Sequence, residues 1–160
     1  MARAHCCGRN QATEGKDLTA YLVLDSSVIV AALRQAEESH QECFDLLEKV
    51  KNGHFIGLEP CSVLIEVVAA IKRRSGSTDL AERVKKDLLD INALKFLELT
   101  SHRAEQAAAI ASKIAVRGMD AVVIQLAREF DSPLVTLDME MKEKAKSIVK
   151  IEAAVDLVTR

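Results

Sequence analysis

The chain has 160 residues, of which 49% are hydrophobic and 29% are charged, and its formal net charge is −2. This length is that of one domain with a substantial core, and the small net charge excludes a strong overall attraction to nucleic acid or membranes. Because aromatic residues make up only 3% of the chain, we do not expect bases to stack on aromatic platforms.

The N-terminal segment of residues 1–19 is polar and contains no apolar core of signal-peptide length. We therefore expect a flexible tail there, followed by a single domain over residues 20–160. The four cysteines form no CxxC pair, which argues against a structural zinc site and fits a reducing cytoplasm. No apolar run approaches the roughly 20 residues needed to span a bilayer, so we expect a soluble cytoplasmic protein without a membrane partner.

Short apolar runs alternate with longer helical patterns along the expected domain. In the first half, the predicted elements are a strand at 21–25, a helix beginning at 28, a helix at 39–53, a strand at 54–59 and a helix at 61–74. In the second half, they are a helix at 79–92, a strand at 94–99, helices at 101–116 and 120–130, a strand at 133–138, a helix at 139–146 and a fifth strand candidate at 149–154. Strands separated by helices predict an α/β sandwich around a largely parallel sheet.

Two acidic residues follow predicted strands directly. Asp25 ends the run LVLD and Asp138 ends the run LVTLD, and each is followed by a predicted helix. Because ligands bind outside the carboxyl ends of the strands in open parallel sheets, both carboxylates are expected to face one crevice if the two strands are neighbours. A third acid, Asp120, stands at the start of the helix that leads into the Asp138 strand.

A fourth acid, Glu66, lies within the apolar helical segment CSVLIEVVAAI. A lone carboxylate in a largely buried helix is costly to desolvate. Glu66 is therefore either a residue at the rim of a polar slot or a buried acid that meets a positive charge.

Helix capping is the simpler explanation for Asp25, Asp120 and Asp138 taken singly. Taken together with Glu66, the four acids favour a shared site, where clustered carboxylates would repel one another unless a cation compensates them. Oxygen ligands without nearby histidine or cysteine favour Mg²⁺ or Mn²⁺ over zinc. Such a site suits the hydrolysis of phosphodiester bonds.

Four segments around these acids resemble, in order and spacing, the acidic motifs of PIN-domain ribonucleases, and most closely those of VapC-type toxins in VapBC toxin–antitoxin pairs. The segments are LDSSVIVAAL, LIEVVAAI, RGMDAVVIQLA and LVTLDMEM. The resemblance covers about residues 21–157. It implies a three-layer sandwich with a central parallel five-stranded sheet, and metal-dependent endonucleolytic cleavage of RNA that leaves a 5′-phosphate and a 3′-hydroxyl.

The resemblance also implies roles for individual residues. The acids at the four matching positions would be the catalytic, metal-binding ligands: Asp25, Glu66, Asp120 and Asp138. The small hydroxyl residues beside them would orient a ligand or its water: Ser26, Ser27 and Thr136.

Because the acids repel RNA, basic side chains must hold its backbone. The candidates are Arg117, which is the strongest because it nearly adjoins Asp120, and Lys72, Arg73 and Arg74. By resemblance we also expect a homodimer and a small antitoxin partner, which would dock on the helices at 39–52 and 60–74.

Other functions remain open at this stage. Within the same enzyme class, the chain would be a PIN-domain nuclease of ribosomal RNA maturation or RNA quality control. From a different class, it would be a catalytically silent PIN-like module that binds RNA or protein, although none of the four acids is missing. A phosphoryl-transfer protein with Asp25 as nucleophile fits less well, because Ser27 stands where a dehalogenase-like motif needs a second Asp.

Overall fold

A computed structural model of the chain describes residues 20–159. The expected tail at 1–19, with Cys6 and Cys7, lies outside the described residues. Cys43 is buried and Cys61 is half-buried, and both are free thiols.

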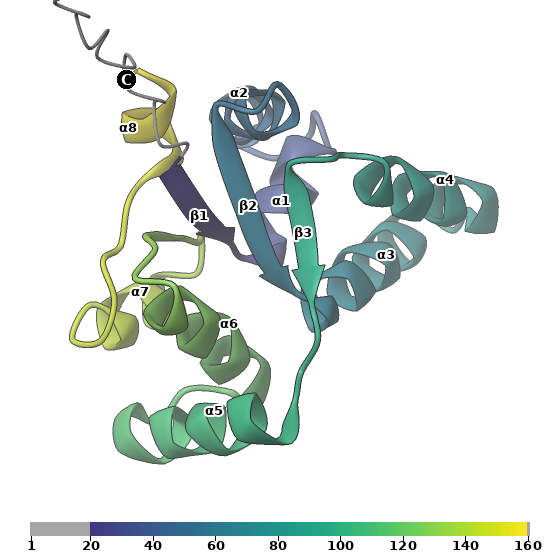
Figure 1. The fold of residues 1–160 in the computed structure, drawn as a ribbon. Coiled ribbons are helices and arrows are strands. Elements are labelled where there is room, and N and C mark those ends of the chain that lie inside the picture. The colour runs from purple at the N-terminus through teal and green to yellow at the C-terminus, as the bar shows by residue number, and fades with distance from the viewer. Residues whose placement is uncertain (1–19, 160) are drawn as a thin grey trace, which may run out of the picture.

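A parallel sheet forms the centre of the described domain, with its strands in the order β3–β2–β1–β4 (Figure 1). The strands are β1 (Ala20–Leu24), β2 (Phe55–Pro60), β3 (Leu94–Leu97) and β4 (Leu134–Val135). Every strand pair is parallel. The predicted α/β class with a parallel sheet is thus confirmed.

Helices cover both sides of the sheet and complete a three-layer arrangement (Figure 1). The helices of residues 20–159 are α1 (Ser26–Ala32), α2 (His40–Lys51), α3 (Cys61–Ser75), α4 (Thr78–Leu89), α5 (Ser101–Ile114), α6 (Gly118–Glu129), α7 (Met139–Ala145) and α8 (Ala154–Val158). Helix α6 packs on β1 and β2 and α5 packs on α6, whereas α2 and α3 contact β2 and α4 packs on α3. No helix among residues 20–159 is long and apolar enough to cross a membrane.

Local signals explain where α3 begins and ends. Pro60 precedes its first turn, where the missing N–H of proline costs little. Gly76 follows its last turn with φ of 72°, a left-handed conformation that glycine adopts without steric penalty. The predicted helix at 61–74 therefore agrees with the observed one to within one residue.

The prediction of a fifth strand at 149–154 is wrong. This segment contributes only an isolated parallel bridge between Ile151 and Leu134, with Leu134 N–H donating to the Lys150 carbonyl at 2.9 Å. The physical reason lies in β4, which spans only two residues because Pro133 precedes it and the chain then turns into the loop that carries Asp138. Residues after the bridge form α8, which the sequence patterns did not predict.

Candidate metal centre

The carboxyl ends of β1 and β4 bring the first and last of the four acids together. These strands are neighbours in the sheet, and Asp25 directly follows β1 while Asp138 lies just beyond β4. The Asp25 N–H donates to the Val135 carbonyl at 2.9 Å, which continues the pairing of the two strands to the point where the site begins. The two strands are thus neighbours, as expected, and Asp25 and Asp138 lie at the same edge of the sheet.

Hydroxyl side chains fix the Asp25 carboxylate. Its Oδ2 accepts hydrogen bonds from Thr136 Oγ1 at 2.9 Å and from Ser27 Oγ at 2.5 Å. Thr136 Oγ1 in turn accepts from the Asp138 N–H at 3.1 Å, and Ser27 Oγ accepts from the Leu137 N–H at 3.0 Å. Asp25 is only 7% exposed and Thr136 1% exposed, so this network is largely shielded from solvent.

Asp25 and Asp138 also cap helices, so capping and ligand binding are not alternatives here. Asp25 Oδ2 accepts from the Ser27 N–H at the start of α1, and Asp138 Oδ1 accepts from the Met141 N–H at the start of α7. In each case one carboxylate oxygen serves the helix. No hydrogen bond from the described residues reaches Asp25 Oδ1, so that oxygen remains for a ligand.

Glu66 on α3 and Asp120 in the first turn of α6 complete the set of acids. Burial raises the pKa of Glu66, the Ser26 hydroxyl opposes this rise, and the negative charges of Asp25 and Asp120 add to it. Burial likewise raises the pKa of Asp120, with further contributions from the charges of Asp25 and Asp138, while Arg117 opposes them. Each acid thus lies within the electrostatic field of others in the set.

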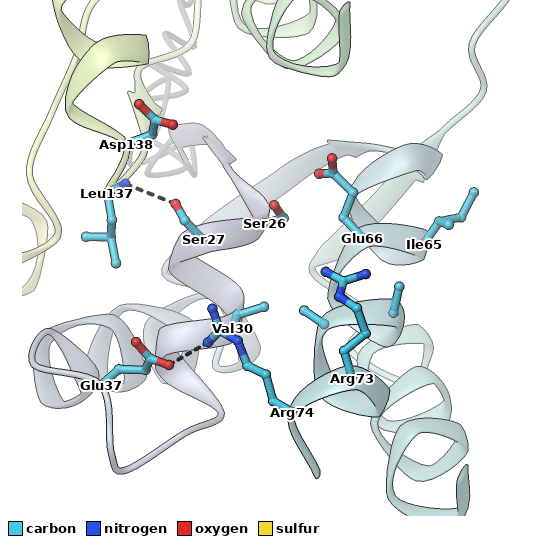
Figure 2. Close-up of a pocket in the computed structure, with 12 residues that line it drawn as sticks. Ser26, Ser27, Val30, Glu37, Ile65, Glu66, Arg73, Arg74, Leu137 and Asp138 are labelled. Atoms are coloured by element: carbon cyan, nitrogen blue, oxygen red, sulfur yellow. Dashed lines mark hydrogen bonds and ion pairs between the residues drawn. The ribbon is translucent and has the colours of Figure 1, made fainter. Parts of the chain in front are cut away.

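An open groove of about 640 Å³ is lined by Glu66 and Asp138, whereas Asp25 and Asp120 are not among the residues that line it. Figure 2 shows Glu66 and Asp138 on opposite sides of Ser26 and Ser27, which lie between them. Arg73 stands beside Glu66 on α3 and points into the same space.

Three of the four predicted basic residues lie at or beside the groove, and one does not. Arg73 and Arg74 line it, and Arg117 Nη1 lies 3.9 Å from Asp138 Oδ2 with its side chain 74% exposed. Arg74 Nη1 is paired with Glu37 at 2.5 Å. Lys72 is not brought into the groove, since its Nζ donates to the Gly76 carbonyl and to Thr78 Oγ1 beyond the end of α3.

One buried acid near the site, Glu59, was missed by the motif comparison. It is 0% exposed, and both of its carboxylate oxygens accept from the Leu24 N–H, at 2.9 and 3.1 Å. The available signal was its position at the end of a predicted strand, which it shares with Asp25.

The residues around the groove fit a hard divalent cation. The oxygen ligands available there are carboxylates and hydroxyls, and the pKa values of Glu66 and Asp120 are raised first by burial and then by the charges of neighbouring acids. Within residues 20–159, no group of three or more acidic, histidine or cysteine side chains is placed so that it could hold a metal ion. This is compatible with Mg²⁺, which is usually held by one or two carboxylates together with waters and substrate phosphates.

Replacing Asp120 by Asn is expected to stabilise the metal-free protein, because it removes a carboxylate whose charged form is disfavoured in the folded chain. We expect Tm in EDTA at neutral pH to rise by about 1–3 °C, a small value because solvent screens an open groove. Since the pKa is higher in the folded than in the unfolded chain, wild-type Asp120 becomes protonated and loses its penalty as the pH falls through the raised pKa.

Calorimetry of both proteins in EDTA, at about pH 7.5 and about pH 4, measures this difference, which should shrink at the lower pH. Asp79→Asn is the matched control, since Asp79 is an exposed acid in the first turn of α4 and its loss should not stabilise the fold. A Tm gain that is equal at both pH values would contradict the electrostatic explanation.

Comparisons with known proteins agree with the fold. The family model described as "PIN domain" matches residues 22–147. No curated protein matches the chain in sequence.

Several solved structures share the architecture at low sequence identity. The Mycobacterium tuberculosis toxin VapC20, described as cleaving the sarcin–ricin loop, has a TM-score of 0.67 and 17% identity and covers 82% of this chain and 98% of its own. PAE2754 from Pyrobaculum aerophilum has a TM-score of 0.63 and 20% identity and covers 91% and 97%. A chain of the DNA-bound VapBC2 complex from Rickettsia felis has a TM-score of 0.61 and 15% identity and covers 83% and 98%. The family model, which matches most of the chain, shows that this protein belongs to the PIN domain family.

Proposed function

We propose that this PIN-domain protein is a divalent-metal-dependent endoribonuclease that hydrolyses RNA phosphodiester bonds and is the toxin of a type II toxin–antitoxin pair. The observation that carries the proposal is a set of four acids whose charges act on one another, two of which, Glu66 and Asp138, line one groove. They come from separate parts of the chain, and burial and mutual repulsion raise the pKa of Glu66 and Asp120. Such a concentration of uncompensated negative charge is the environment that a divalent cation stabilises.

The side chains of the groove have distinct tasks in this proposal. When bound, Mg²⁺ or Mn²⁺ would polarise a phosphoryl oxygen and supply hydroxide at neutral pH. The candidate ligands are Asp25, Glu66, Asp120 and Asp138, of which one or two would hold the ion directly, together with waters and substrate phosphates. Thr136 and Ser27 keep the Asp25 carboxylate in one orientation, and the Ser26 hydroxyl does the same for Glu66.

Basic side chains beside the acids support an RNA substrate. A phosphate chain must approach four carboxylates, so cations are needed where it enters and leaves. Arg73 and Arg74 line the groove from α3, and Arg117 stands next to Asp138. We propose that these three arginines contact the RNA backbone.

The toxin role rests on the structural neighbours and on an apolar groove. The similar structures include VapC and VapBC proteins, which supports an antitoxin partner and, by family resemblance, a homodimer. The second groove, of about 470 Å³, lies between α2 and α4. Phe44 and Leu33 line it while remaining 42% and 39% exposed, above the buried Leu47 and Leu88. An exposed apolar surface of this kind favours a protein partner.

Cleavage of a mixed RNA pool tests the proposed activity. The wild-type protein should cut RNA with Mn²⁺ or Mg²⁺, leave 5′-phosphate ends and lose all cleavage in EDTA. Cleavage that persists in EDTA, or none with either ion, would overturn the proposal. Growth arrest on expression, relieved by a short reading frame encoded beside the gene, would separate a toxin from an RNA-maturation nuclease.

Arg73 and Lys72 offer a matched pair of neighbouring cations for testing RNA contact. Arg73→Ala should weaken RNA binding by about 3- to 10-fold and reduce the slope of log affinity against log salt by about one, because one phosphate contact is lost. Lys72→Ala should leave affinity and slope nearly unchanged, since Lys72 Nζ is bound at the end of α3 instead.

Salt-dependent fluorescence anisotropy with single-stranded RNA in Ca²⁺, which prevents turnover in many Mg²⁺-dependent nucleases, measures both variants. Equal effects of the two substitutions would contradict a direct contact between Arg73 and RNA. They would mean that the basic residues in the last turn of α3 act only through their overall charge.

A further inference from the structure

Glu59 is a completely buried carboxyl group whose only hydrogen-bond partner among the described residues is a backbone amide. Both of its oxygens accept from the Leu24 N–H, at 2.9 and 3.1 Å, and its side chain is 0% exposed. Burial raises the pKa of Glu59 well above its usual range, the bond from Leu24 opposes the rise, and the charge of Asp25 adds to it. An acid in this position is costly to the fold, and an apolar residue would fill a strand interior more cheaply.

The pairing of the two central strands explains what this carboxyl does. Strands β1 and β2 pair in register from Ala20–Phe55 to Leu22–Gly57. Beyond this point β1 pairs with β4, and β2 pairs with β3 as far as Pro60–Leu97. The next N–H of β1 that faces β2 belongs to Leu24. This N–H donates to the Glu59 carboxylate instead of to a backbone carbonyl of β2.

The two central strands therefore part at the end that carries the acids, and Glu59 spans the gap. Leu24 immediately precedes Asp25 on one side of the gap. Glu59 lies two residues before Cys61, where α3 begins and leads to Glu66 on the other side. Gly57, on the same side of β2 as Glu59, leaves the space that the crowded strand interior requires, since a Cβ there would lie 2.6 Å from Leu94 Cδ1 and 3.5 Å from Glu59 Oε1.

We infer that Glu59 is a positioning residue that sets the separation between Asp25 and Glu66 by bridging the parted ends of β1 and β2. The inference rests on the proposed metal site, to which Glu59 contributes through the Leu24 amide and not as a ligand. Its buried position keeps it away from RNA. Loss of the bridge would let the ends of β1 and β2 move relative to each other, and so misplace Asp25 against Glu66.

Mn²⁺ binding to three variants tests this role without relying on activity. Glu59→Leu removes the acceptor at similar volume and should weaken Mn²⁺ binding by about 10-fold, a loss comparable to that from removing a side chain that orients a metal ligand. Glu59→Gln keeps one acceptor oxygen and should retain affinity within about 3-fold. Leu157→Ala, which opens the core in α8 away from the groove, should lower Tm without changing Mn²⁺ affinity.

Titration calorimetry and Mn²⁺ electron paramagnetic resonance, run well below the lowest Tm, give the affinities. A Glu59→Leu protein that binds Mn²⁺ as tightly as wild type would overturn the inference while leaving the metal site intact. If Glu59→Leu does not fold, Glu59→Gln decides. Mn²⁺ affinity within about 3-fold of wild type is the expected result, and a loss of more than about 10-fold in that folded variant would overturn the inference, because the acceptor for the Leu24 N–H is still present.

A metal-free measurement keeps the inference separate from the proposed function. In nuclear magnetic resonance spectra recorded in EDTA, Glu59→Leu should shift the Leu24 and Asp25 amide resonances and speed hydrogen exchange at Leu24. Unchanged Leu24 and Asp25 amides would overturn the positioning role whether or not the protein binds metal. Absence of Mn²⁺ binding by the wild type would overturn the metal site, and with it the inferred role of Glu59 at that site.

Discussion

Replacing Asp25 by Asn is expected to abolish metal-dependent RNA cleavage, with a loss of about 100-fold or more, while the protein stays folded. Substitutions of residues that merely orient metal ligands typically cost about 10- to 100-fold, and removal of a ligand's charge should cost at least as much. Asn is as good a helix cap as Asp, so α1 keeps its first turn. The substitution therefore separates the helix cap that the structure shows from the proposed role of Asp25 as a metal ligand.

Initial rates of cleavage of a fluorescent RNA with Mn²⁺, together with Tm in EDTA, measure the two effects. Asp79→Asn serves as the matched control, because it removes an exposed carboxylate from another helix start and should leave the rate unchanged. Equal rates for wild type and Asp25→Asn would mean that Asp25 is only a cap.

The positions of Asp25 and Asp138 could be predicted because parallel topology constrains them. Each follows a recognisable apolar strand, and the carboxyl ends of parallel strands lie at one edge of the sheet. Glu66 was conspicuous for a different reason, since an acid within an apolar helix demands an explanation. Local sequence was enough to place these three residues because Asp25 and Asp138 follow strands, and Glu66 lies within a helix, that sequence patterns define well.

The fifth strand and Glu59 show where such reasoning stops. The apolar segment around Ile151 has the composition of a strand, but its pairing depends on β4, which ends after two residues. Register between strands is a tertiary property, and it also decides that Leu24 meets a side chain rather than a backbone carbonyl. Pattern alone could therefore place Glu59 at the end of a strand without showing that it is buried.

Helix capping and the proposed ligand binding use the same side chains at two positions. An N-cap side chain lies at the mouth of a helix, where the partial positive charge of the N-terminus favours an anion. At Asp25 and Asp138 the helix uses one oxygen of each carboxylate, which fixes its orientation. The same geometry that starts α1 and α7 thus prearranges two of the candidate ligands.

Thr136→Val is expected to weaken Mn²⁺ binding by about 10- to 100-fold, the usual cost of removing a side chain that orients a metal ligand. Thr136 Oγ1 donates to Asp25 Oδ2 and accepts from the Asp138 N–H, so one hydroxyl connects two of the four acids. Valine has nearly the same shape but no hydroxyl, and at 1% exposure no solvent replaces the lost bonds. The free energy of unfolding should fall by about 1–3 kcal/mol, because the buried Asp25 carboxylate loses a donor and the half-buried Asp138 N–H loses its acceptor.

Thr136→Ser is the matched control, since it keeps the hydroxyl and removes only a methyl group. It should retain Mn²⁺ affinity within about 3-fold, even though the buried cavity it creates costs about 1 kcal/mol of stability. Titration calorimetry with Mn²⁺ and denaturant unfolding in EDTA separate affinity from stability for both variants. Loss of Mn²⁺ affinity in both variants would assign the effect to packing around β4. Loss in Thr136→Val alone would assign it to the Thr136 hydroxyl, which fixes Asp25 and Asp138 in one arrangement before any ion binds.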